Sequence, residues 1–432
     1  MIFGNITTNI DGFQLRARPL GHLRDSARAG DEFHNGHMFP TCTPIDAASA
    51  LEQGRQQGSA IRAQAWHSRN TYARLFAHCG IDWAMACQRA MSYAPVIEAL
   101  DAALLHEMEG LAQGCGLGFA EVLALNCRTE ILPPDFLASS GSHATQALQA
   151  NRAAGLPDWL DEQPLDPAIE EGECTAMVVA PEAAQDGQSW FAQNWDWLGR
   201  QRQALVLLHS ANTAGTRFIT LTEGGMLAKI GMNQHGFALG LNILRSHDDG
   251  RRPGVPVHVL LRYLLGMPGV ADVRQALTHI GSTLGFGAAS NIPCADASGE
   301  VACFEVAPAG WAELHPEQGV VVHTNHFVCG SLLATQAPLG QTLSSQPRLD
   351  TARQHARGAP LDFEKLQAFL RDESDGHLSI CRSPDPALPP EGRVESVAGI
   401  IMRPATREIW IAPDVPRRCG FERIDTARLQ AG

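Results

Sequence analysis

The sequence predicts an α+β fold, in which helices are followed by a long series of strands. From Thr43 to Glu121 the apolar residues recur at three- and four-residue spacing, which is typical of helices. From Cys174 onwards, short apolar runs separated by turn residues predict a long series of strands. Because runs of helices and runs of strands do not alternate strictly, α+β is favoured over a parallel α/β sheet. Strands with one apolar face indicate two stacked sheets with helices outside.

The composition divides the chain into four segments. Residues 1–40 mix Gly, Asn, Arg and His without periodicity, and we expect a loosely ordered N-terminal extension. Residues 41–136 are predicted to be mostly helical, with one helix near Val96–Gln113. Residues 137–173 are rich in Ala, Ser, Gly, Gln and Pro and then become acidic, which is typical of a flexible linker. Residues 174–432 hold the predicted strands.

The elements of the last segment follow from the apolar runs. Strands are expected at residues 174–180, 189–196, 204–210, 217–222, 224–233, 236–244, 289–297, 301–308, 319–327, 396–404 and 408–413. Helices are expected near Val255–Leu265, Val270–Ile280, Arg348–Arg357 and Phe363–Arg371.

Charge and composition exclude several classes of function. The net charge is −13, from 33 basic and 46 acidic residues, whereas nucleic-acid binding needs a basic surface. No apolar stretch approaches the roughly eighteen residues that a membrane span requires, so we expect no membrane partner. The eleven cysteines include no CxxC pair and the N-terminus has no apolar run of signal-peptide length. Reduced thiols and a cytoplasmic location are therefore predicted.

Cys174 opens the first predicted strand, directly behind the acidic end of the linker. Cleavage of the Glu173–Cys174 bond would leave an N-terminal residue with both a thiol and a free α-amine. An α-amine has a pKa of about 7.7–8.0 and can act as the general base for the thiol. Before cleavage, the same thiol can attack the preceding carbonyl in an N-to-S acyl shift that ends in hydrolysis. The alternative is a buried structural cysteine, which the pattern alone favours for any one of eleven cysteines.

Three other residues are candidates for a site around Cys174. Asp196 ends the second predicted strand, and antiparallel pairing would bring it near the start of the first, where an acid can orient an α-amine. A turn-forming Asp is the alternative. Asn325, in the segment VHTNH, can donate to an oxyanion. Arg393 precedes the last predicted hairpin and lies either at the surface or against a carboxylate such as Asp196.

Neither a metal nor a cofactor is predicted. His323 and His326 are three residues apart on a strand, which places them on opposite faces, and no HExxH motif occurs. The glycine-rich pieces GCGLGF and GFGAASN do not have phosphate-loop spacing. A papain-like pair of Cys174 and His323 is disfavoured because such a cysteine begins a helix, whereas Cys174 begins a strand.

Seven segments follow one another in an order and spacing that is known from one family: ALNCRTE, Cys174-Thr175, AQNWDW, FITLTEGGMLAKIGMNQHGFALGLNIL, RRPGVPVHVLLRYLL, VHTNH and SICR. Together they resemble the acyl-coenzyme A:6-aminopenicillanic acid acyltransferase (isopenicillin N acyltransferase) family of self-processing N-terminal-nucleophile proteins. The resemblance covers Phe39–Glu130 and Cys174–Pro413. It implies a four-layer αββα fold of two antiparallel sheets flanked by helices, and autocatalytic cleavage into two chains.

By position, the resemblance also implies roles for the site residues. Cys174 is similar to the family's nucleophile, Asp196 to the acid near the α-amine, Asn325 to the oxyanion donor and Arg393 to the arginine of the site. The sequence departs from the family at the cleavage point, where Glu173 stands in place of the common Gly, which eases strained backbone geometry. The linker ahead of Cys174 is also longer than the family's.

These observations predict a self-cleaving enzyme that forms a thioester on Cys174 and hydrolyses or transfers the acyl group of an amide. Its expected partners are a small-molecule acyl amide or thioester and its own cleaved N-terminal fragment. One alternative is a coenzyme A thioester-dependent acyltransferase or thioesterase, although no basic patch for the coenzyme phosphates is visible in the sequence. Another is a non-catalytic protein that stays uncleaved and binds a ligand on the same fold.

Overall fold

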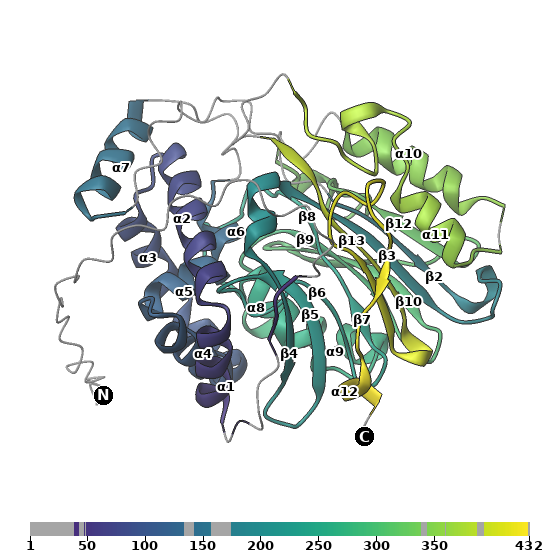
Figure 1. Cartoon of the computed structure of the whole chain (residues 1–432), viewed down its shortest axis with the longest axis horizontal. Coiled ribbons are helices and arrows are strands. Elements are labelled where there is room, and N and C mark those ends of the chain that lie inside the picture. Colours follow the sequence, from purple (N-terminus) through teal and green to yellow (C-terminus); the bar gives the residue numbers. More distant parts are fainter. Residues whose placement is uncertain are drawn as a thin grey trace, which may run out of the picture. The chain divides into compact units, whose positions relative to one another are not determined.

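Two β-sheets form the middle of the molecule in the computed structural model (Figure 1). The structure describes residues 39–42, 47, 49–133, 142–156, 174–337, 344–358, 360–386 and 393–430. Residues 39–432 form one compact unit. The predicted N-terminal extension, residues 1–40, therefore lies almost wholly outside the described residues.

The smaller sheet carries the first strand of segment 174–432. Its order is β12–β2–β3–β13–β14–β15, and every pair in it is antiparallel. The strands are β12 (Val320–His323), β2 (Cys174–Val179), β3 (Trp190–Leu198), β13 (Val394–Arg403), β14 (Glu408–Ala412) and β15 (Glu422–Arg423). All residues of β2 and β3 are buried, which explains why both read as nearly continuous apolar runs in the sequence.

In the described part of the chain the larger sheet has nine strands, and β1 pairs with β4 in parallel while the other pairs are antiparallel. The strands are β1 (Thr41–Cys42), β4 (Leu205–Ala211), β5 (Arg217–Glu223), β6 (Ile230–Asn233), β7 (Ala238–Leu239), β8 (Asn242–Ile243), β9 (Ser290–Ala295), β10 (Val301–Ala307) and β11 (Gly310–Leu314). The strand expected over 236–244 is divided into β7 and β8, which both pair with β9. Strands β1 and β11 were not predicted, because one has two residues and the other is half-buried throughout.

The two sheets pack face to face and are covered by helices on both sides. Strands β2 and β3 contact β9 of the larger sheet. On the outer face of the smaller sheet, α10 (Ser345–Ala356) packs on β12 and β2, and α11 (Phe363–Leu370) packs on β3 and β13. Helix α9 (Val270–Thr283) contacts β11, and α2 (Arg62–His78) contacts β5 of the larger sheet. This confirms the expected α+β fold with four layers, helix–sheet–sheet–helix.

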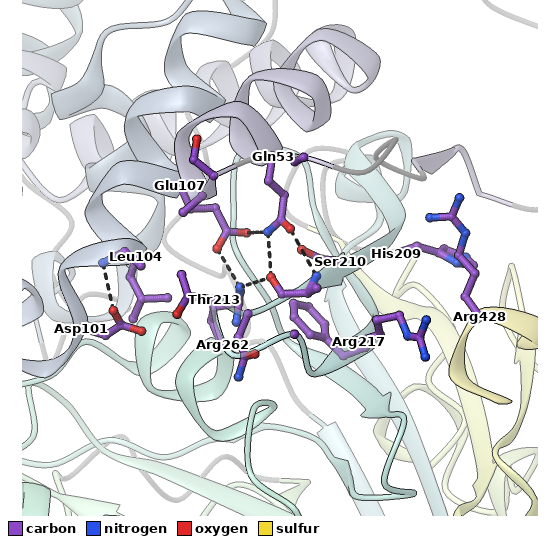
Figure 2. Close-up of a pocket in the computed structure, with 18 of the residues that line it drawn as sticks. Gln53, Asp101, Leu104, Glu107, His209, Ser210, Thr213, Arg217, Arg262 and Arg428 are labelled. Atoms are coloured by element: carbon purple, nitrogen blue, oxygen red, sulfur yellow. Dashed lines mark hydrogen bonds and ion pairs between the residues drawn. The ribbon is translucent and has the colours of Figure 1, made fainter. Parts of the chain in front are cut away.

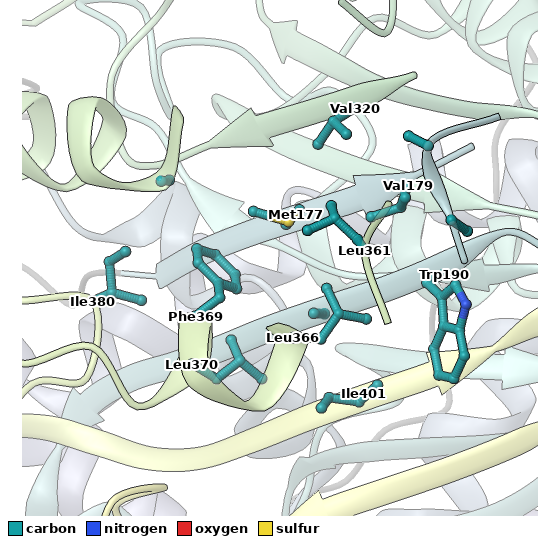
Figure 3. Packing of buried hydrophobic residues seen from close by; sticks show 14 residues of the cluster. Met177, Val179, Trp190, Val320, Leu361, Leu366, Phe369, Leu370, Ile380 and Ile401 are labelled. Atoms are coloured by element: carbon teal, nitrogen blue, oxygen red, sulfur yellow. The ribbon is translucent and has the colours of Figure 1, made fainter. Parts of the chain in front are cut away.

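A hydrophobic cluster holds α11 onto the smaller sheet (Figure 3). Met177 and Ile401 of the sheet face Leu366, Phe369 and Leu370 of the helix, and all five are buried. Alternate residues of a strand share a face, so Met177 points towards α11 whereas its neighbours in β2 point towards the larger sheet. Cys174 therefore belongs to the face between the two sheets.

Residues 50–131 are mostly helical. Their helices are α1 (Ala50–Ala60), α2, α3 (Trp83–Met91), α4 (Ala94–Cys115), α5 (Phe119–Asn126) and α6 (Arg128–Ile131). Helices α1 and α4 approach so closely that a Cβ atom on Gly54 would lie 2.0 Å from the carbonyl oxygen of Glu107. Glycine at this position therefore permits direct contact between the two backbones.

The region expected to be a flexible linker contains one further helix. Helix α7 (Ser142–Ala153) lies within the predicted linker 137–173 and packs on α2. Residues 157–173, which include Glu173, lie outside the described residues. The remaining helices are α8 (Val257–Leu264) and the C-terminal α12 (Ala427–Gln430). Among the helices that the structure describes, none is long and apolar enough to cross a lipid bilayer.

Candidate active site

Cys174 lies at the N-terminal end of β2, between the ends of two neighbouring strands. On one side it is paired with Trp195 of β3. On the other side His323 of β12 is paired with Ala176, so the chain beyond β12 runs past Cys174 two residues later, at Asn325. The Cys174 backbone nitrogen donates a hydrogen bond of 2.9 Å to Asn325 Oδ1. The register of the sheet thus brings Asn325 and Asp196 to the two sides of Cys174.

Asp196 is buried next to Cys174 and is held by the neighbouring strand. Its backbone N–H donates to the Cys174 thiol sulfur. Ser396, its partner across β13, donates from Oγ to Asp196 Oδ1 at 2.6 Å. Antiparallel pairing therefore places Asp196 beside the start of β2.

Asn325 is oriented by four hydrogen bonds. Its Oδ1 accepts from the Cys174 nitrogen and from Arg348 Nη2, both at 2.9 Å. Its Nδ2 donates to the carbonyl of Ile243 at 3.0 Å, and its backbone nitrogen donates to Ser345 Oγ at 2.9 Å. In the uncleaved chain the amide oxygen, not the amide nitrogen, therefore faces Cys174.

Arg348 is a site residue that the sequence analysis did not single out. It lies in the first turn of α10 and is fully buried. Its Nη1 donates to the Cys174 carbonyl at 2.8 Å and to Thr175 Oγ1 at 2.7 Å, while Nη2 reaches Asn325. One guanidinium thus fixes both Cys174 and Asn325. The sequence places it in a helix with apolar spacing and gives no sign that this helix end faces the start of β2.

Arg393, the predicted arginine of the site, is not grouped with these residues. Val394 pairs with Leu198 and Ser396 with Asp196, so Arg393 lies three residues beyond Asp196 along the strand, roughly 10 Å away. Its Nη2 donates to the carbonyl of Pro386 at 3.2 Å, in a half-exposed position. Arg393 therefore lies farther along the strand from Asp196 than the sequence analysis expected.

Another arginine lies closer to Asp196. Arg382, in the segment SICR, is 1% exposed, and its backbone nitrogen donates at 2.9 Å to the same Ser396 Oγ that bonds Asp196. Burial lowers the pKa of Arg382 to about 10. SICR is one of the seven segments that carry the family resemblance. No physical feature of the sequence, however, indicated that its arginine is buried.

Like Arg348, Lys229 is a buried cation near the Cys174 thiol. Burial raises the pKa of Cys174 to about 11, while Lys229 and Arg348 act in the opposite direction. The Lys229 Nζ lies 3.5 Å from the centroid of the Trp195 ring, the residue paired with Cys174. Burial, followed by the charge of Arg128, lowers the pKa of Lys229 to about 7. At neutral pH the thiol is thus protonated and the amine is partly neutral.

The histidines of VHTNH are engaged elsewhere. His323 Nε2 lies 2.8 Å from Glu305 Oε1, and its Nδ1 lies 2.8 Å from the Thr324 carbonyl. His326 Nδ1 lies 2.7 Å from Ser345 Oγ. A papain-like pair of Cys174 and His323 is therefore absent from the geometry. Within the described part of the chain, no group of three or more His, Cys, Asp or Glu residues is arranged to hold a metal ion.

A cavity of about 630 Å³ lies away from these residues (Figure 2). It is bordered by α1, α4 and the hairpin of β4 and β5, and its lining includes Gln53, Glu107, His209, Arg217 and Arg262. None of the lining residues belongs to the group around Cys174, which is itself only 2% exposed. The candidate nucleophile is thus covered in the uncleaved chain.

Comparison with known proteins decides the family. The family model of the acyl-coenzyme A:6-aminopenicillanic acid acyl-transferases matches residues 183–418, more than half of the chain. The chain belongs to this acyltransferase family. The matched region contains Asp196, Lys229, Asn325 and Arg382, and it begins after Cys174.

One relative of this chain is the 40 kDa form of acyl-coenzyme A:6-aminopenicillanic-acid acyltransferase from Emericella nidulans. It is 27% identical over 281 residues, which are 64% of this chain and 66% of the relative, just under two thirds of its length. Penicillin V acylase from Agrobacterium tumefaciens has a TM-score of 0.41 at 16% identity, covering 60% of this chain and 87% of its own. A mutant form of conjugated bile acid hydrolase from Clostridium perfringens has a TM-score of 0.35 at 15% identity, covering 60% of this chain and 94% of its own.

Proposed function

We propose that this acyltransferase-family protein cleaves its own Glu173–Cys174 bond and then uses Cys174 as an N-terminal nucleophile. The observation that carries the proposal is the hydrogen bond from the Cys174 nitrogen to Asn325 Oδ1. That oxygen, already oriented by Arg348, would accept equally from an α-amine at the same position. Cleavage would thus create a primary amine in a site that is built before cleavage.

The chemistry follows from the groups around Cys174. The α-amine would take the thiol proton, and the thiolate would attack the acyl carbonyl of the substrate. The acyl group would pass to Cys174 as a thioester while the leaving amine takes the proton. Water or an amine would then take the acyl group and regenerate the thiol. Asp196 would stabilise the ammonium form of the α-amine, and Asn325 Nδ2 would serve the oxyanion after giving up the Ile243 carbonyl.

The substrate that we propose is a small-molecule acyl amide, and hydrolysis is the simplest reaction because water is always present. Transfer to an amine needs a second acceptor site. The name of the Emericella nidulans relative, an acyl-coenzyme A-dependent acyltransferase, favours a thioester donor as the second candidate. We also propose that the cleaved fragment 1–173 stays bound, since its helix α2 packs on β5. A cytoplasmic location stays a prediction from the cysteine content.

The acyl-enzyme gives a direct test. The purified protein is mixed with a series of N-acyl amides and acyl thioesters of increasing chain length, quenched in acid and digested. The proposal expects the acyl mass on the peptide that begins with Cys174, and no adduct in a Cys174→Ser variant at the same quench time. Cys381, another buried cysteine, serves as the matched control, because a Cys381→Ser variant should still be acylated. An adduct on any other cysteine would contradict the proposal.

A further inference from the structure

Self-cleavage at Cys174 poses a chemical problem that the cleaved enzyme does not have. In the proposed mature enzyme the α-amine takes the thiol proton, but before cleavage that nitrogen is an amide and cannot accept one. Burial raises the pKa of the Cys174 thiol to about 11, so little thiolate forms by itself near neutral pH. A side chain close to the thiol that accepts the proton would remove this barrier.

Lys229 lies on the face of the smaller sheet to which the Cys174 thiol belongs. Cys174 and Trp195 are directly opposed in β2 and β3, and directly opposed residues point to the same face. The Lys229 amine lies 3.5 Å from the centre of the Trp195 ring and interacts electrostatically with Cys174. Lys229 is 1% exposed and directly precedes β6, so its amine lies between the sheets. Strand alternation assigns Asp196, which Ser396 bonds, to the opposite face.

Burial, followed by the charge of Arg128, favours the neutral form of Lys229. Glu223 Oε1 lies 4.0 Å from Lys229 Nζ and 3.7 Å from Arg128 Nη2, and no hydrogen bond from the described residues reaches that oxygen. One buried carboxylate therefore faces two cations. A second positive charge in this dry space is costly because both cations share the Glu223 carboxylate at ion-pair distance.

The N-terminal segment holds this carboxylate in place. Tyr72 of α2 donates to Glu223 Oε2 at 2.6 Å, and Gln201 donates to the same oxygen at 2.6 Å. Arg128 of α6 lies over the ring of Tyr72 at 5.1 Å and over that of Trp197 at 4.8 Å. Residues that precede the cleavage point thus set the surroundings of Lys229 while the chain is still whole.

We propose that Lys229 is the general base that takes the proton of the Cys174 thiol during self-cleavage. This inference rests on the proposed function, because it assigns a residue to the cleavage step of that proposal.

Self-cleavage needs only the Lys229 amine, the Cys174 thiol, the Glu173 carbonyl and water. The neutral Lys229 amine accepts the thiol proton and becomes an ammonium ion. The Cys174 thiolate attacks the carbonyl carbon of Glu173, a C–S bond forms, and the C–N bond between Glu173 and Cys174 breaks. Lys229 returns the proton to the departing nitrogen, which becomes the α-amine. Water then hydrolyses the thioester and frees the thiol.

The surrounding charges give the step a pH dependence. The charged and titratable groups that interact electrostatically with Lys229 are Arg128 on α6, Glu223 on β5, Cys174 on β2, His258 on α8 and, from the other face of the smaller sheet, Asp196 on β3. Burial and then Arg128 lower the pKa of Lys229 to about 7, against the opposing charges of Glu223, Cys174 and Asp196. Burial likewise lowers the pKa of His258, so His258 adds no positive charge beside Lys229 near neutral pH. The cleavage rate should therefore rise with pH through about 7 and then level off.

The experiment measures the rate of self-cleavage as a function of pH. The whole chain is made by cell-free synthesis, moved rapidly into buffers on both sides of neutrality, and followed by intact mass. Wild type is compared with Lys229→Met and Lys229→Arg. The sequence contains one other lysine, Lys365, which is exposed, so Lys365→Met is the matched control. Thermal unfolding of each chain establishes that it is folded.

The proposal expects both Lys229 variants to cleave about 10²–10⁴-fold more slowly near neutral pH, the usual contribution of a general base. Arg keeps the positive charge but cannot accept a proton, so a fast Lys229→Arg variant would overturn the proposal. Wild type should level off above pH 7. A wild-type rate that keeps rising in proportion to hydroxide would also overturn it, and this readout needs no variant.

The outcomes separate the two proposals. If wild type is cleaved and Lys229→Met is cleaved at the same rate, only the role of Lys229 is rejected. If wild type stays whole at every pH, the proposed function fails, and the role of Lys229 fails with it.

Discussion

Two buried clusters of charge in this molecule contain similar residues but pair them differently. At the wall of the cavity, Arg262 Nη2 donates to Glu107 Oε2 at 2.8 Å and to the Ala211 carbonyl at 3.0 Å (Figure 2). Gln53 Nε2 adds a hydrogen bond of 3.2 Å to Glu107 Oε1. Beside Cys174, by contrast, Lys229 and Arg128 share Glu223 at distances of 4.0 and 3.7 Å.

The difference separates a structural pair from a reactive one. The Arg262 cluster has one cation and one anion in direct contact, so both charges are compensated and each is held by further bonds. The Lys229 cluster has two cations and one anion, with no hydrogen bond between Lys229 and the carboxylate. A buried amine whose charge is incompletely compensated titrates near neutral pH, and this one lies beside a thiol. The comparison predicts that mutations in the first cluster affect stability, whereas mutations in the second affect the rate of self-cleavage.

The largest expected effect is on stability in the Arg262 cluster. Glu107→Ala leaves Arg262 as an uncompensated buried cation, which should lower the free energy of unfolding by about 3–5 kcal/mol. Urea denaturation measures this change. The matched control is the double variant Glu107→Leu with Arg262→Met, which removes both charges and should recover most of the loss. If Glu107→Ala were as stable as wild type, or if it folded but cleaved itself slowly, the assignment of a structural role to the Arg262 cluster would be wrong.

The next effect distinguishes two arginines. Arg348→Met removes the hydrogen bonds that hold Cys174 and Asn325, and should slow both self-cleavage and acyl release by about 10²-fold or more, as for loss of a preorganised donor. Arg393→Met removes an arginine whose guanidinium donates to Pro386, and should change either rate by less than about twofold. Rates are measured by intact mass and by product release. If both variants slowed self-cleavage and acyl release equally, Arg393 would have to be counted among the site residues.

The smallest expected effect is a shift in pH dependence. Glu223 stabilises the ammonium form and so raises the pKa of Lys229. Glu223→Gln removes this influence, which lowers the pKa, so the midpoint of the cleavage profile should move to lower pH by up to about one unit, equal to 1.4 kcal/mol. The exposed carboxylate Glu364 provides the control, because Glu364→Gln should leave the midpoint unchanged. A shift to higher pH would contradict the assigned electrostatics.

Much of the fold was predictable from the sequence because periodicity is local. The apolar runs at 174–180 and 189–196 became β2 and β3, and their pairing follows from their antiparallel order. The parallel pairing of β1 with β4 was not predictable, because Thr41–Cys42 is too short for a periodic signal and its partner is far along the chain. Helix α7 was missed because its polar composition is also typical of linkers.

The candidate site was predictable only where a residue lies near a strand end. Asp196 lies two residues before the end of β3 and Asn325 lies two residues beyond the end of β12, so sheet register brings both to Cys174. Arg348 and Lys229 approach from a helix and from the opposite sheet, and only the packing of layers reveals their contact. Arg393 was taken for the site arginine because it precedes the last predicted hairpin and matches the family's arginine by position, yet it lies three residues beyond the position opposite Asp196.

The denatured mass of the purified protein, measured beside that of a Cys174→Ala variant, tests the central claim most directly. The account predicts that wild type separates into residues 1–173 and 174–432, and that the variant remains one chain of 432 residues. A wild-type chain that stays whole over the full pH range, or a Cys174→Ala chain that is cleaved at the same bond, would contradict it.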